Sequence, residues 1–378
     1  MNLIKLKAFF LQFPFITPKR IIYSCEEWIT DSFKSKGNYM GQRGSWFKYV
    51  YSSNFLHLHP PKTLGVQNPL PFKNNQNFYT AKSNLYQLQN CFLLGYMGLV
   101  LTKKNEVFQE FTHNFNISSL KKFFLKNPFY TFSKTFENAG FTGAVLISPQ
   151  SHNYYHWLSD VLPRIKLYED VFSEIDFFCV SSNVPEKFLD VLPQFGIPKE
   201  KLYRVNEKEK LFFNYLYVAS LPGSEGRAPV WAIEYIKEKF VGIGTNSQSE
   251  KIYLRRGDKN PRQILNETEI IEALKLRGFK IINPDELSVF EQIILMKQAK
   301  VVISAHGAAL TNLLFVNENT AVIEIFSPQY FRTDCFYTLS AIKNLNYYYI
   351  VGEKVDGKPW GDVKVSIEIL EKTLNELI

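Results

Sequence analysis

Residues 300–315, KVVISAHGAALTNLLF, decide the fold that we predict for this chain. The apolar run at 301–303 is typical of a strand buried on both faces of a parallel sheet. Small residues interrupt the pattern at 304–309, and helix-compatible residues follow. A strand that ends at a His-Gly-Ala turn and leads into a helix directs backbone N–H groups to the carboxyl edge of the sheet. Open α/β sheets bind ligands at that edge, and a helix N-terminus favours an anion such as a diphosphate. One glycine-containing turn can equally serve packing, so the interpretation depends on the neighbouring sequence.

Strand and helix patterns alternate on both sides of that stretch. Apolar runs of strand length recur, and most of them are followed by a segment with helical character. Asn266 with Glu269, and Ser288 with Glu291, have the spacing of a capping box at a helix start. Repeated βα units favour an α/β fold with a parallel sheet and right-handed crossovers. The predicted strands of this half are 251–256, 279–283, 300–305, 320–326 and 347–352.

Three groups of residues would meet at the carboxyl edge of this sheet. Arg255 and Arg256 end one predicted strand and Arg262 follows in the next loop; guanidinium groups donate paired hydrogen bonds to phosphate oxygens. The turn at 306–308 would add backbone N–H groups. Glu324 lies in an otherwise apolar strand, where a carboxylate is costly unless it has a partner, and ribose hydroxyl groups are one such partner. A solvated strand end for the arginines and an internal ion pair for the glutamate are the structural alternatives.

A second informative stretch is residues 143–170, GAVLISPQSHNYYHWLSDVLPRIKLYED. It predicts a buried strand, a turn, and a helix that begins near His152 and ends or kinks at Pro163. On that helix His152, His156 and Asp160 are spaced four residues apart and share one face. An imidazole beside a carboxylate suits a general base, because the carboxylate fixes the ring tautomer and stabilises the imidazolium. Zinc binding by HxxxH is disfavoured because the glutamate of HExxH and a third ligand are missing. A structural role for the histidines stays open.

These motifs together resemble glycosyltransferase family 61. The resemblance is carried by SHNYYHWLSDVLPR, by a YLRR strand followed by RQILNE, by FEQIILMKQA, and by ISAHGAALTNLLF followed by AVIEIF. It covers about residues 90–351 and is most specific at 143–163 and 251–326. The family includes plant arabinoxylan xylosyltransferases, the extracellular protein O-linked N-acetylglucosamine transferase and many bacterial capsule-locus proteins.

The resemblance implies a GT-B architecture, in which two Rossmann-like domains face a cleft, and an inverting transfer from a UDP-linked donor held by the C-terminal domain. The family's catalytic segment falls on His152, His156 and Asp160, with either His156 or Asp160 as the base. Its phosphate-side arginine falls on Arg256, but the paired arginines leave open which of them faces the diphosphate. The implied acceptor is a glycan or a lipid-linked oligosaccharide, in capsular or other surface polysaccharide biosynthesis. The predicted nucleotide-sugar-binding residues are Arg255, Arg256, Arg262, His306, Gly307, Ala308, Asn312 and Glu324.

An inverting transferase needs a base for the acceptor hydroxyl and positive groups for the departing diphosphate. Many transferases hold Mg²⁺ or Mn²⁺ with a DxD motif for the second task, but this chain has no DxD. We therefore predict metal-independent transfer without a cofactor. The alternative is a non-catalytic carbohydrate- or nucleotide-binding module on the same fold, which has no use for a base. An NAD-dependent oxidoreductase is disfavoured because no GxGxxG follows a predicted strand.

The 378 residues are long enough for two domains. We place an N-terminal, acceptor-side domain at 79–225 and a C-terminal, nucleotide-sugar-binding domain at 226–378. We predict that an irregular segment, 1–78, precedes the first domain or packs on it. Packing of the last helix on the N-terminal domain is a predicted alternative to packing on its own domain.

The composition limits the classes of partner and the cellular compartment that we predict for this chain. The net charge of +8 comes from scattered Lys and Arg, which suits an anionic substrate or a membrane surface and not nucleic acid. Four distant cysteines argue against a zinc site and a disulfide scaffold, and fit a reducing compartment. The N-terminus, MNLIKLKAFFLQFPFITPKR, lacks the features of a signal peptide and is either a weak interfacial anchor or a segment packed on its own domain. We predict a cytoplasmic protein, with peripheral contact at the inner face of the membrane as an option.

Overall fold

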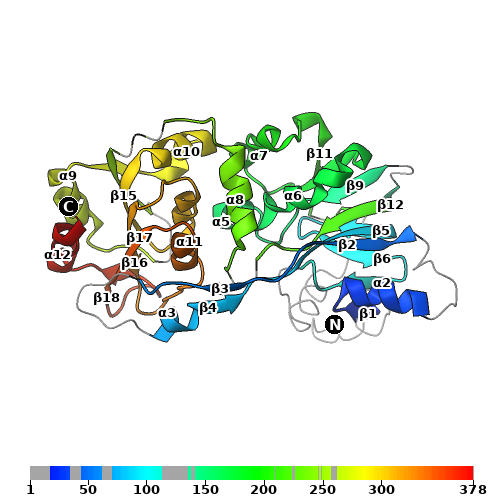
Figure 1. Ribbon diagram of the computed structural model, residues 1–378, viewed down its shortest axis with the longest axis horizontal. Coiled ribbons are helices and arrows are strands. Elements are labelled where there is room, and N and C mark those ends of the chain that lie inside the picture. The colour runs from blue at the N-terminus through cyan, green and yellow to red at the C-terminus, as the bar shows by residue number, and fades with distance from the viewer. Residues whose placement is uncertain are drawn as a thin grey trace, which may run out of the picture. The chain divides into compact units, whose positions relative to one another are not determined.

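The computed structural model describes residues 18–34, 44–61, 70–112, 135–137, 141–207, 209–223, 226–245, 247, 249–256 and 262–377. The chain forms two compact units (Figure 1). The first contains Met1–Ser53 and Lys82–Pro222, and the second contains Asn54–Ala81 and Gly223–Ile378. The predicted membrane contact of the N-terminus concerns residues 1–20, of which 1–17 lie outside the described residues. Within the described ranges, no helix combines the length and the hydropathy needed to cross a bilayer.

The second unit is organised around a five-stranded sheet. Among the described residues, each strand of this sheet is parallel to the strands beside it. This confirms the predicted α/β class and the parallel C-terminal sheet. The strand order is β14-β13-β15-β16-β17, so the order reverses between β13 and β15. In doubly wound α/β sheets, ligands bind at the carboxyl ends of the two strands that flank such a reversal. The strands are β13 (Glu250–Leu254), β14 (Phe279–Ile282), β15 (Ala299–Ala305), β16 (Ala321–Phe326) and β17 (Asn346–Val351).

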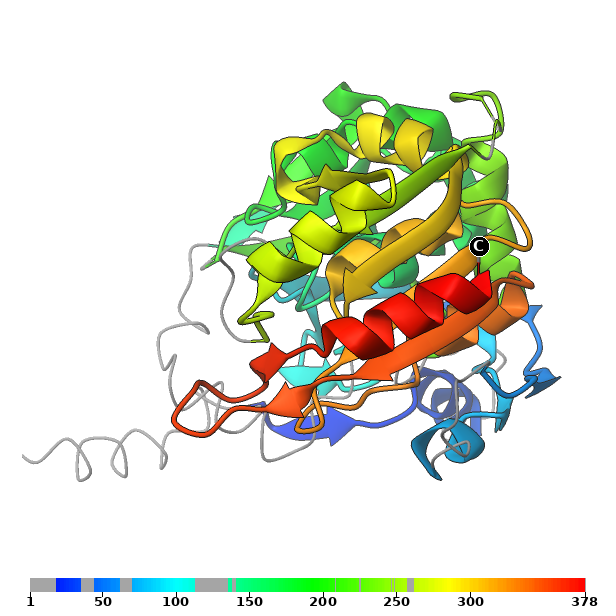
Figure 2. The ribbon, with the colours of Figure 1, turned by 90° about the vertical axis from the view of Figure 1, so that its left-hand side faces the viewer.

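Helices and short hairpins complete the second unit. The helices α9 and α12 lie together on one face of the sheet, as Figure 2 shows. Ile303 and Ile323 of the central strands form a core there with Leu274 of α9 and Leu370 of α12. The elements are β3 (Phe55–His57), α3 (Leu70–Asn74), β4 (Asn77–Tyr79), α8 (Val230–Lys239), α9 (Glu267–Leu276), η7 (Pro284–Glu286), α10 (Val289–Lys297), η8 (Ala308–Leu314), α11 (Phe336–Ile342), β18 (Glu353–Lys354), β19 (Val363–Lys364) and α12 (Ile367–Leu377).

Side chains alternate between the two faces of the central strands. In the register of β15 with β16, Ser304 is opposite Glu324. Because successive strand residues point to opposite faces, Glu324 and Phe326 point away from the α9–α12 core. The backbone N–H of His306 donates to the carbonyl of Ile325 at 2.8 Å, which extends the ladder by one bond. His306 is thereby held beside Glu324 and Phe326, at the carboxyl end of β15.

The two predicted capping boxes have different outcomes. At α10, Ser288 accepts from the Glu291 N–H while the Glu291 side chain accepts from the Ser288 N–H, so this prediction is confirmed. At α9, Asn266 is the N-cap residue but its side chain makes no cap hydrogen bond, so the second prediction is wrong in its chemistry. The Asn266 amide instead exchanges two hydrogen bonds with the backbone of Val365, at 2.9 and 3.0 Å. The amide nitrogen still donates to Oε2 of Glu269 at 3.3 Å, but a partner 99 residues away has taken the place of the cap hydrogen bond.

Part of the N-terminal segment contributes to the core of the second unit. Phe72 on α3 has no exposed surface. Its ring is the centre of an aromatic cluster, with centroid distances from 4.7 to 6.3 Å. Such pairs add to the free energy gained from burying apolar area alone. The ring partners of Phe72 are Phe326, Phe331, Tyr337, Tyr347 and Tyr349.

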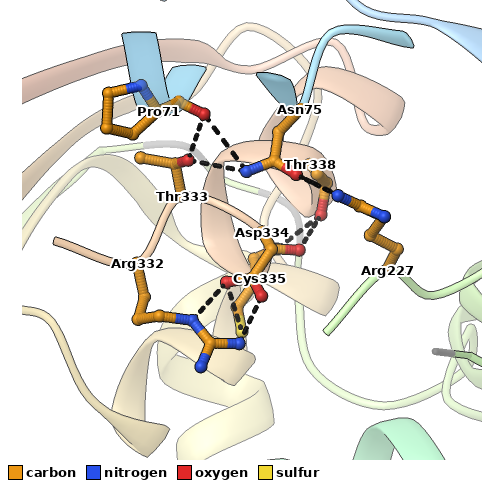
Figure 3. A network of polar contacts seen from close by, with 8 residues as sticks. All are labelled: Pro71, Asn75, Arg227, Arg332, Thr333, Asp334, Cys335 and Thr338. Carbon is orange, nitrogen blue, oxygen red and sulfur yellow. Dashed lines mark hydrogen bonds and ion pairs between the residues drawn. The ribbon is translucent and has the colours of Figure 1, made fainter. Parts of the chain in front are cut away.

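Polar contacts fix the same segment (Figure 3). The buried amide of Asn75 accepts from the Arg227 guanidinium at 2.6 and 3.1 Å through its oxygen. Its nitrogen donates to Thr333 Oγ1 at 2.8 Å and to the carbonyl of Pro71 at 3.2 Å. Thr333 also donates to Pro71, at 2.8 Å. Three separate parts of the chain therefore meet at one buried amide, which is costly to leave unpaired.

The first unit contains a mixed sheet of ten strands among the described residues. The strands β9, β10 and β11 are parallel, and β12 runs parallel to β9 and antiparallel to β5. The strands are β1 (Arg20–Ile22), β2 (Trp46–Tyr51), β5 (Ser83–Leu94), β6 (Leu99–Thr102), β7 (Glu106–Phe108), β8 (Thr135–Glu137), β9 (Thr142–Val145), β10 (Phe177–Ser181), β11 (Leu202–Val205) and β12 (Lys210–Ala219). The helical elements are α2 (Cys25–Lys34), α5 (Tyr154–His156), η3 (Trp157–Val161), α6 (Arg164–Tyr168), η4 (Glu169–Glu174), α7 (Glu186–Leu189), η5 (Leu192–Phe195) and η6 (Lys199–Lys201).

Candidate functional site

Two arginines converge at the sheet reversal of the second unit. Nη1 of Arg256 donates to the carbonyl oxygen of His306 at 3.2 Å, and Nη1 of Arg262 donates to the same oxygen at 3.4 Å. Burial first, and then repulsion from Arg262, lower the pKa of Arg256 to about 10. Arg256 is therefore still a cation at neutral pH, held beside a second cation. An anion bound there would relieve that repulsion.

Arg255 is placed differently from its neighbour. Its guanidinium donates to Oε2 of Glu267, at 3.1 and 3.3 Å. Glu267 opens helix α9 and also accepts from the hydroxyl of Tyr253 at 2.9 Å. Arg255 therefore has a carboxylate partner, whereas Arg256 and Arg262 share a carbonyl oxygen. Of the three arginines predicted from the sequence, the structure brings Arg256 and Arg262 together at the turn.

Gly307 makes room for the arginine pair. Its backbone is extended, with φ of 175°, a conformation that any residue adopts. A Cβ atom at this position, however, would lie 2.4 Å from Nη1 of Arg256. A side chain at this position would therefore push the guanidinium of Arg256 away from the His306 carbonyl.

The helix after the turn is a short 3₁₀ helix, η8, that begins at Ala308. Asn312 on this helix is fully buried. Its amide nitrogen donates to Oε1 of Gln292 on α10 at 2.8 Å and to the carbonyl of Ala309 at 3.1 Å. Asn312 therefore ties the turn to α10 from inside the unit.

His306 and Glu324 form a buried pair behind the arginines. Nδ1 of His306 lies 2.5 Å from Oε1 of Glu324, and the hydroxyl of Tyr347 donates to Oε2 at 2.5 Å. Burial and the nearby carboxylate raise the pKa of Tyr347 well above its usual value, so the phenol keeps its proton. The imidazole also stacks on Phe326, with ring centroids 5.4 Å apart.

This arrangement gives Glu324 a role other than the ribose contact expected from the sequence. Its side chain has no exposed surface, and both carboxylate oxygens already have protein partners. With Nδ1 directed at the carboxylate, Nε2 is the ring nitrogen of His306 for which we find no hydrogen-bond partner among the described residues. Glu324 thus holds the orientation of His306 at the end of β15.

The first unit carries the predicted pair His156 and Asp160. Nδ1 of His156 lies 2.6 Å from Oδ2 of Asp160, and Ser159 Oγ donates to Oδ1 at 3.0 Å. The predicted contact across four residues is therefore present. His156 ends the short helix α5, and Asp160 lies in η3, a π-helical turn. Single π-helical turns inside helices occur frequently at functional sites.

The helix begins close to His152, as predicted, but His152 itself lies outside it, so the predicted common helical face of His152 with His156 and Asp160 is wrong. The side chain of Asn153 accepts from the N–H of Tyr155 at 2.9 Å, which makes Asn153 the N-cap. The helix begins at Tyr154, and His152 lies exposed in the preceding turn. The signal was present in the sequence, because asparagine is among the preferred N-cap residues.

Arg164 is a buried residue of this site that the sequence analysis did not single out. It donates to the carbonyl of Ile147 at 2.9 Å and to the carbonyl of Ala219 at 2.8 and 3.1 Å. Burial lowers the pKa of its guanidinium, and the charge of Asp160 acts in the opposite direction. Arg164 thus ties the His156–Asp160 segment to the carboxyl ends of β9 and β12. Its position four residues after Asp160 was the available signal.

The described residues contain no group of three or more His, Cys, Asp or Glu side chains arranged to hold a metal ion. The candidate residues form two clusters. One is the turn at 306–308 with Arg256 and Arg262 in the second unit, and the other is the pair His156 and Asp160 in the first unit.

Comparison with known proteins identifies relatives of the central part of the chain. The Glycosyltransferase 61 family model matches residues 154–323. A β-1,2-xylosyltransferase, RCN11, of Oryza sativa subsp. japonica is 29% identical over 136 residues, which is 32% of this chain and 25% of that protein. The EGF domain-specific O-linked N-acetylglucosamine transferase of Rattus norvegicus is 33% identical over 98 residues, 25% of this chain and 18% of that protein.

The chain spans at most a quarter of the length of these curated relatives. The family match nevertheless includes the His156–Asp160 pair, Arg256, Arg262 and the turn at 306–308. It confirms the resemblance predicted from the sequence motifs. Residues 154–323 of this chain are therefore similar to glycosyltransferase family 61.

Proposed function

We propose that this chain is an inverting, metal-independent glycosyltransferase that moves a sugar from a UDP-linked donor to a hydroxyl group of a glycan or lipid-linked oligosaccharide. The observation that carries the proposal is the convergence of Arg256 and Arg262 on the carbonyl of His306 at the sheet reversal. Two adjacent cations at the carboxyl edge of a parallel sheet suit a diphosphate. The family match over residues 154–323 supports glycosyl transfer as the reaction.

In this proposal the two arginines stabilise the negative charge that develops on the departing diphosphate. His306 contributes through Nε2, because Glu324 holds Nδ1. In the first unit, the histidine–carboxylate pair takes the proton of the acceptor hydroxyl. With Nδ1 of His156 on Asp160, the proton would be taken by Nε2, and the carboxylate would stabilise the resulting imidazolium. The reverse assignment, with Asp160 as the base, uses the same contact.

The finer parts of the proposal follow the family resemblance. They are a GT-B architecture, a place in capsular or other surface polysaccharide biosynthesis, and a cytoplasmic location with peripheral membrane contact. The absence of a DxD motif from the sequence supports metal independence, because no such pair of carboxylates is present to hold Mg²⁺ or Mn²⁺ at the diphosphate.

Replacing Arg256 by alanine tests the donor site. Losing one charge-assisted hydrogen bond to phosphate costs about 1.5–3 kcal/mol, so we expect UDP to bind about 10- to 150-fold more weakly in titration calorimetry. Arg255→Ala is the matched control, because Arg255 is engaged by Glu267 and should leave UDP affinity within about twofold. If Arg255→Ala weakened UDP binding and Arg256→Ala left it unchanged, the diphosphate would be assigned to Arg255 instead.

Chelation tests metal independence. We expect turnover to remain at its initial rate after dialysis against EDTA, because cationic side chains, and not a bound metal ion, neutralise the diphosphate in this proposal. The measurement is sugar transfer before and after dialysis, with Mn²⁺ added back as the control. Loss of activity in EDTA that Mn²⁺ restores would contradict the metal-independent mechanism.

A further inference from the structure

We propose that Trp360, supported by Tyr330, is the stacking platform for the nucleobase of the donor. The inference rests on the proposed function, because it assigns the diphosphate of the same donor to Arg256 and Arg262. It adds the part of the site that recognises the flat, uncharged end of the ligand.

Tyr330 connects the proposed platform to the cationic turn. Its ring meets the His306 imidazole edge to face, with centroids 5.4 Å apart. The guanidinium of Arg262 lies over the same tyrosine, 4.7 Å from the ring centroid. Tyr330 also meets the indole of Trp360 edge to face, with centroids 5.4 Å apart. An aromatic surface therefore begins directly beside the groups that we assign to the diphosphate.

Trp360 is the exposed member of this surface. Its side chain is 52% exposed, although burying an indole is among the larger apolar gains available to a fold. A large aromatic ring that is exposed beside charged groups indicates a binding surface, whereas an isolated exposed leucine does not. Part of Tyr330 is already covered by Arg262, so the indole offers the aromatic area that remains for a ligand.

The loop that carries Trp360 is pinned to the arginine site. Asp362 is buried, and its Oδ1 accepts from the backbone N–H groups of Arg262 and Gln263 at 2.8 and 2.9 Å. The N–H of Gly361 donates to Oε1 of Gln329 at 2.9 Å. These bonds fix the backbone beside Trp360, which lowers the entropy cost of presenting its ring to a ligand.

Gly361 also shows how close the two parts of the site are. Its φ of +89° lies in the region that favours glycine, and a Cβ atom there would lie 2.7 Å from Cγ of Arg262. The stem of Arg262 therefore passes directly against the residue next to Trp360. A nucleoside diphosphate joins an anion to a planar ring through one ribose. The paired arginines suit the anion, and the neighbouring indole suits the planar ring.

The test compares two ligands on the full chain by titration calorimetry. Inorganic pyrophosphate contains the anion alone, and UDP contains the anion and the base. We expect Trp360→Ala to weaken UDP binding about 5- to 150-fold, the range that stacking of one base on an aromatic side chain provides, and to change pyrophosphate affinity by less than about twofold. Trp360→Phe should restore most of the UDP affinity. Arg256→Ala should weaken both ligands, and Tyr79→Ala, a 70% exposed aromatic of β4, should weaken neither.

The other possible results distinguish a failure of the Trp360 platform from a failure of the donor site at Arg256 and Arg262. If Arg256→Ala weakens UDP while Trp360→Ala leaves it unchanged, the platform is wrong and the donor site stands. If Trp360→Ala weakens pyrophosphate as much as UDP, the loop supports Arg262 and the stacking role is wrong. If the wild-type chain binds neither ligand, the donor site itself is wrong. If Trp360→Ala lowers sugar transfer from a UDP-sugar but not UDP affinity, the indole contacts the sugar and the nucleobase assignment is overturned.

Discussion

Replacing His156 by alanine is expected to lower kcat by about 10²–10⁴-fold, the usual contribution of general-base catalysis. The affinity for UDP should stay within about twofold, because the proposed nucleotide site is on the second unit. Asp160→Asn should cause a loss of similar order, since it removes the carboxylate that lies 2.6 Å from Nδ1 of His156. Steady-state sugar transfer and calorimetry with UDP measure the two quantities separately.

His152→Ala is the matched control for that experiment. It removes a histidine from the same motif, but one that is exposed and lies outside the helix, so kcat should be nearly unchanged. Wild-type turnover in both His156→Ala and Asp160→Asn, with folding intact, would leave the pair structural and favour the binding-module alternative.

Phe72→Ala is expected to reduce the unfolding free energy of the second unit by about 3–5 kcal/mol, the range for large-to-small changes at buried aromatic residues. Phe72 has no exposed surface and contacts five other aromatic rings. Its loss leaves a cavity beside Phe326 and Tyr347, the two residues that stack on His306 and bind Glu324. Hydrogen exchange measured on peptides from β16 and β17 reports this local change in stability.

Phe55→Ala controls for the removal of an aromatic ring from the same N-terminal segment. Phe55 is 54% exposed, and a surface substitution of this kind should change stability by about 0.5 kcal/mol or less. Equal protection of β16 and β17 in wild type and Phe72→Ala would show that the N-terminal segment is not part of the core of the second unit.

The sequence by itself determined the features that depend on neighbours a few residues apart. The apolar run and small residues at 300–315 were sufficient for a strand of a parallel sheet followed by a turn at its carboxyl end, because strand length and turn chemistry are local properties. Spacing alone also placed His156 against Asp160, since residues four apart meet on a helix even where one turn is π-helical. The capping box at Ser288 succeeded for the same reason.

Tertiary structure decided whatever depended on partners far along the chain. Arg255 and Arg256 are adjacent in sequence, yet Glu267 engages one and the carbonyl of His306 accepts from the other. Glu324 was recognisable as a costly buried carboxylate, but nothing in the strand itself shows that His306 and Tyr347 would take both oxygens. The choice is made by which donors the folded sheet brings within hydrogen-bonding distance.

Dependence on distant partners also explains why the sequence did not predict the place of the segment around Phe72 and Asn75. The segment that carries Phe72 and Asn75 has little periodicity of its own and is punctuated by prolines. Its hydrogen-bond partner Thr333 lies 258 residues further along the chain. An apolar side chain gains the same free energy from any close-packed core, so composition shows that Phe72 will be buried but not where. Only the assembled sheet, with β16 and β17 presenting an aromatic face, specifies its place.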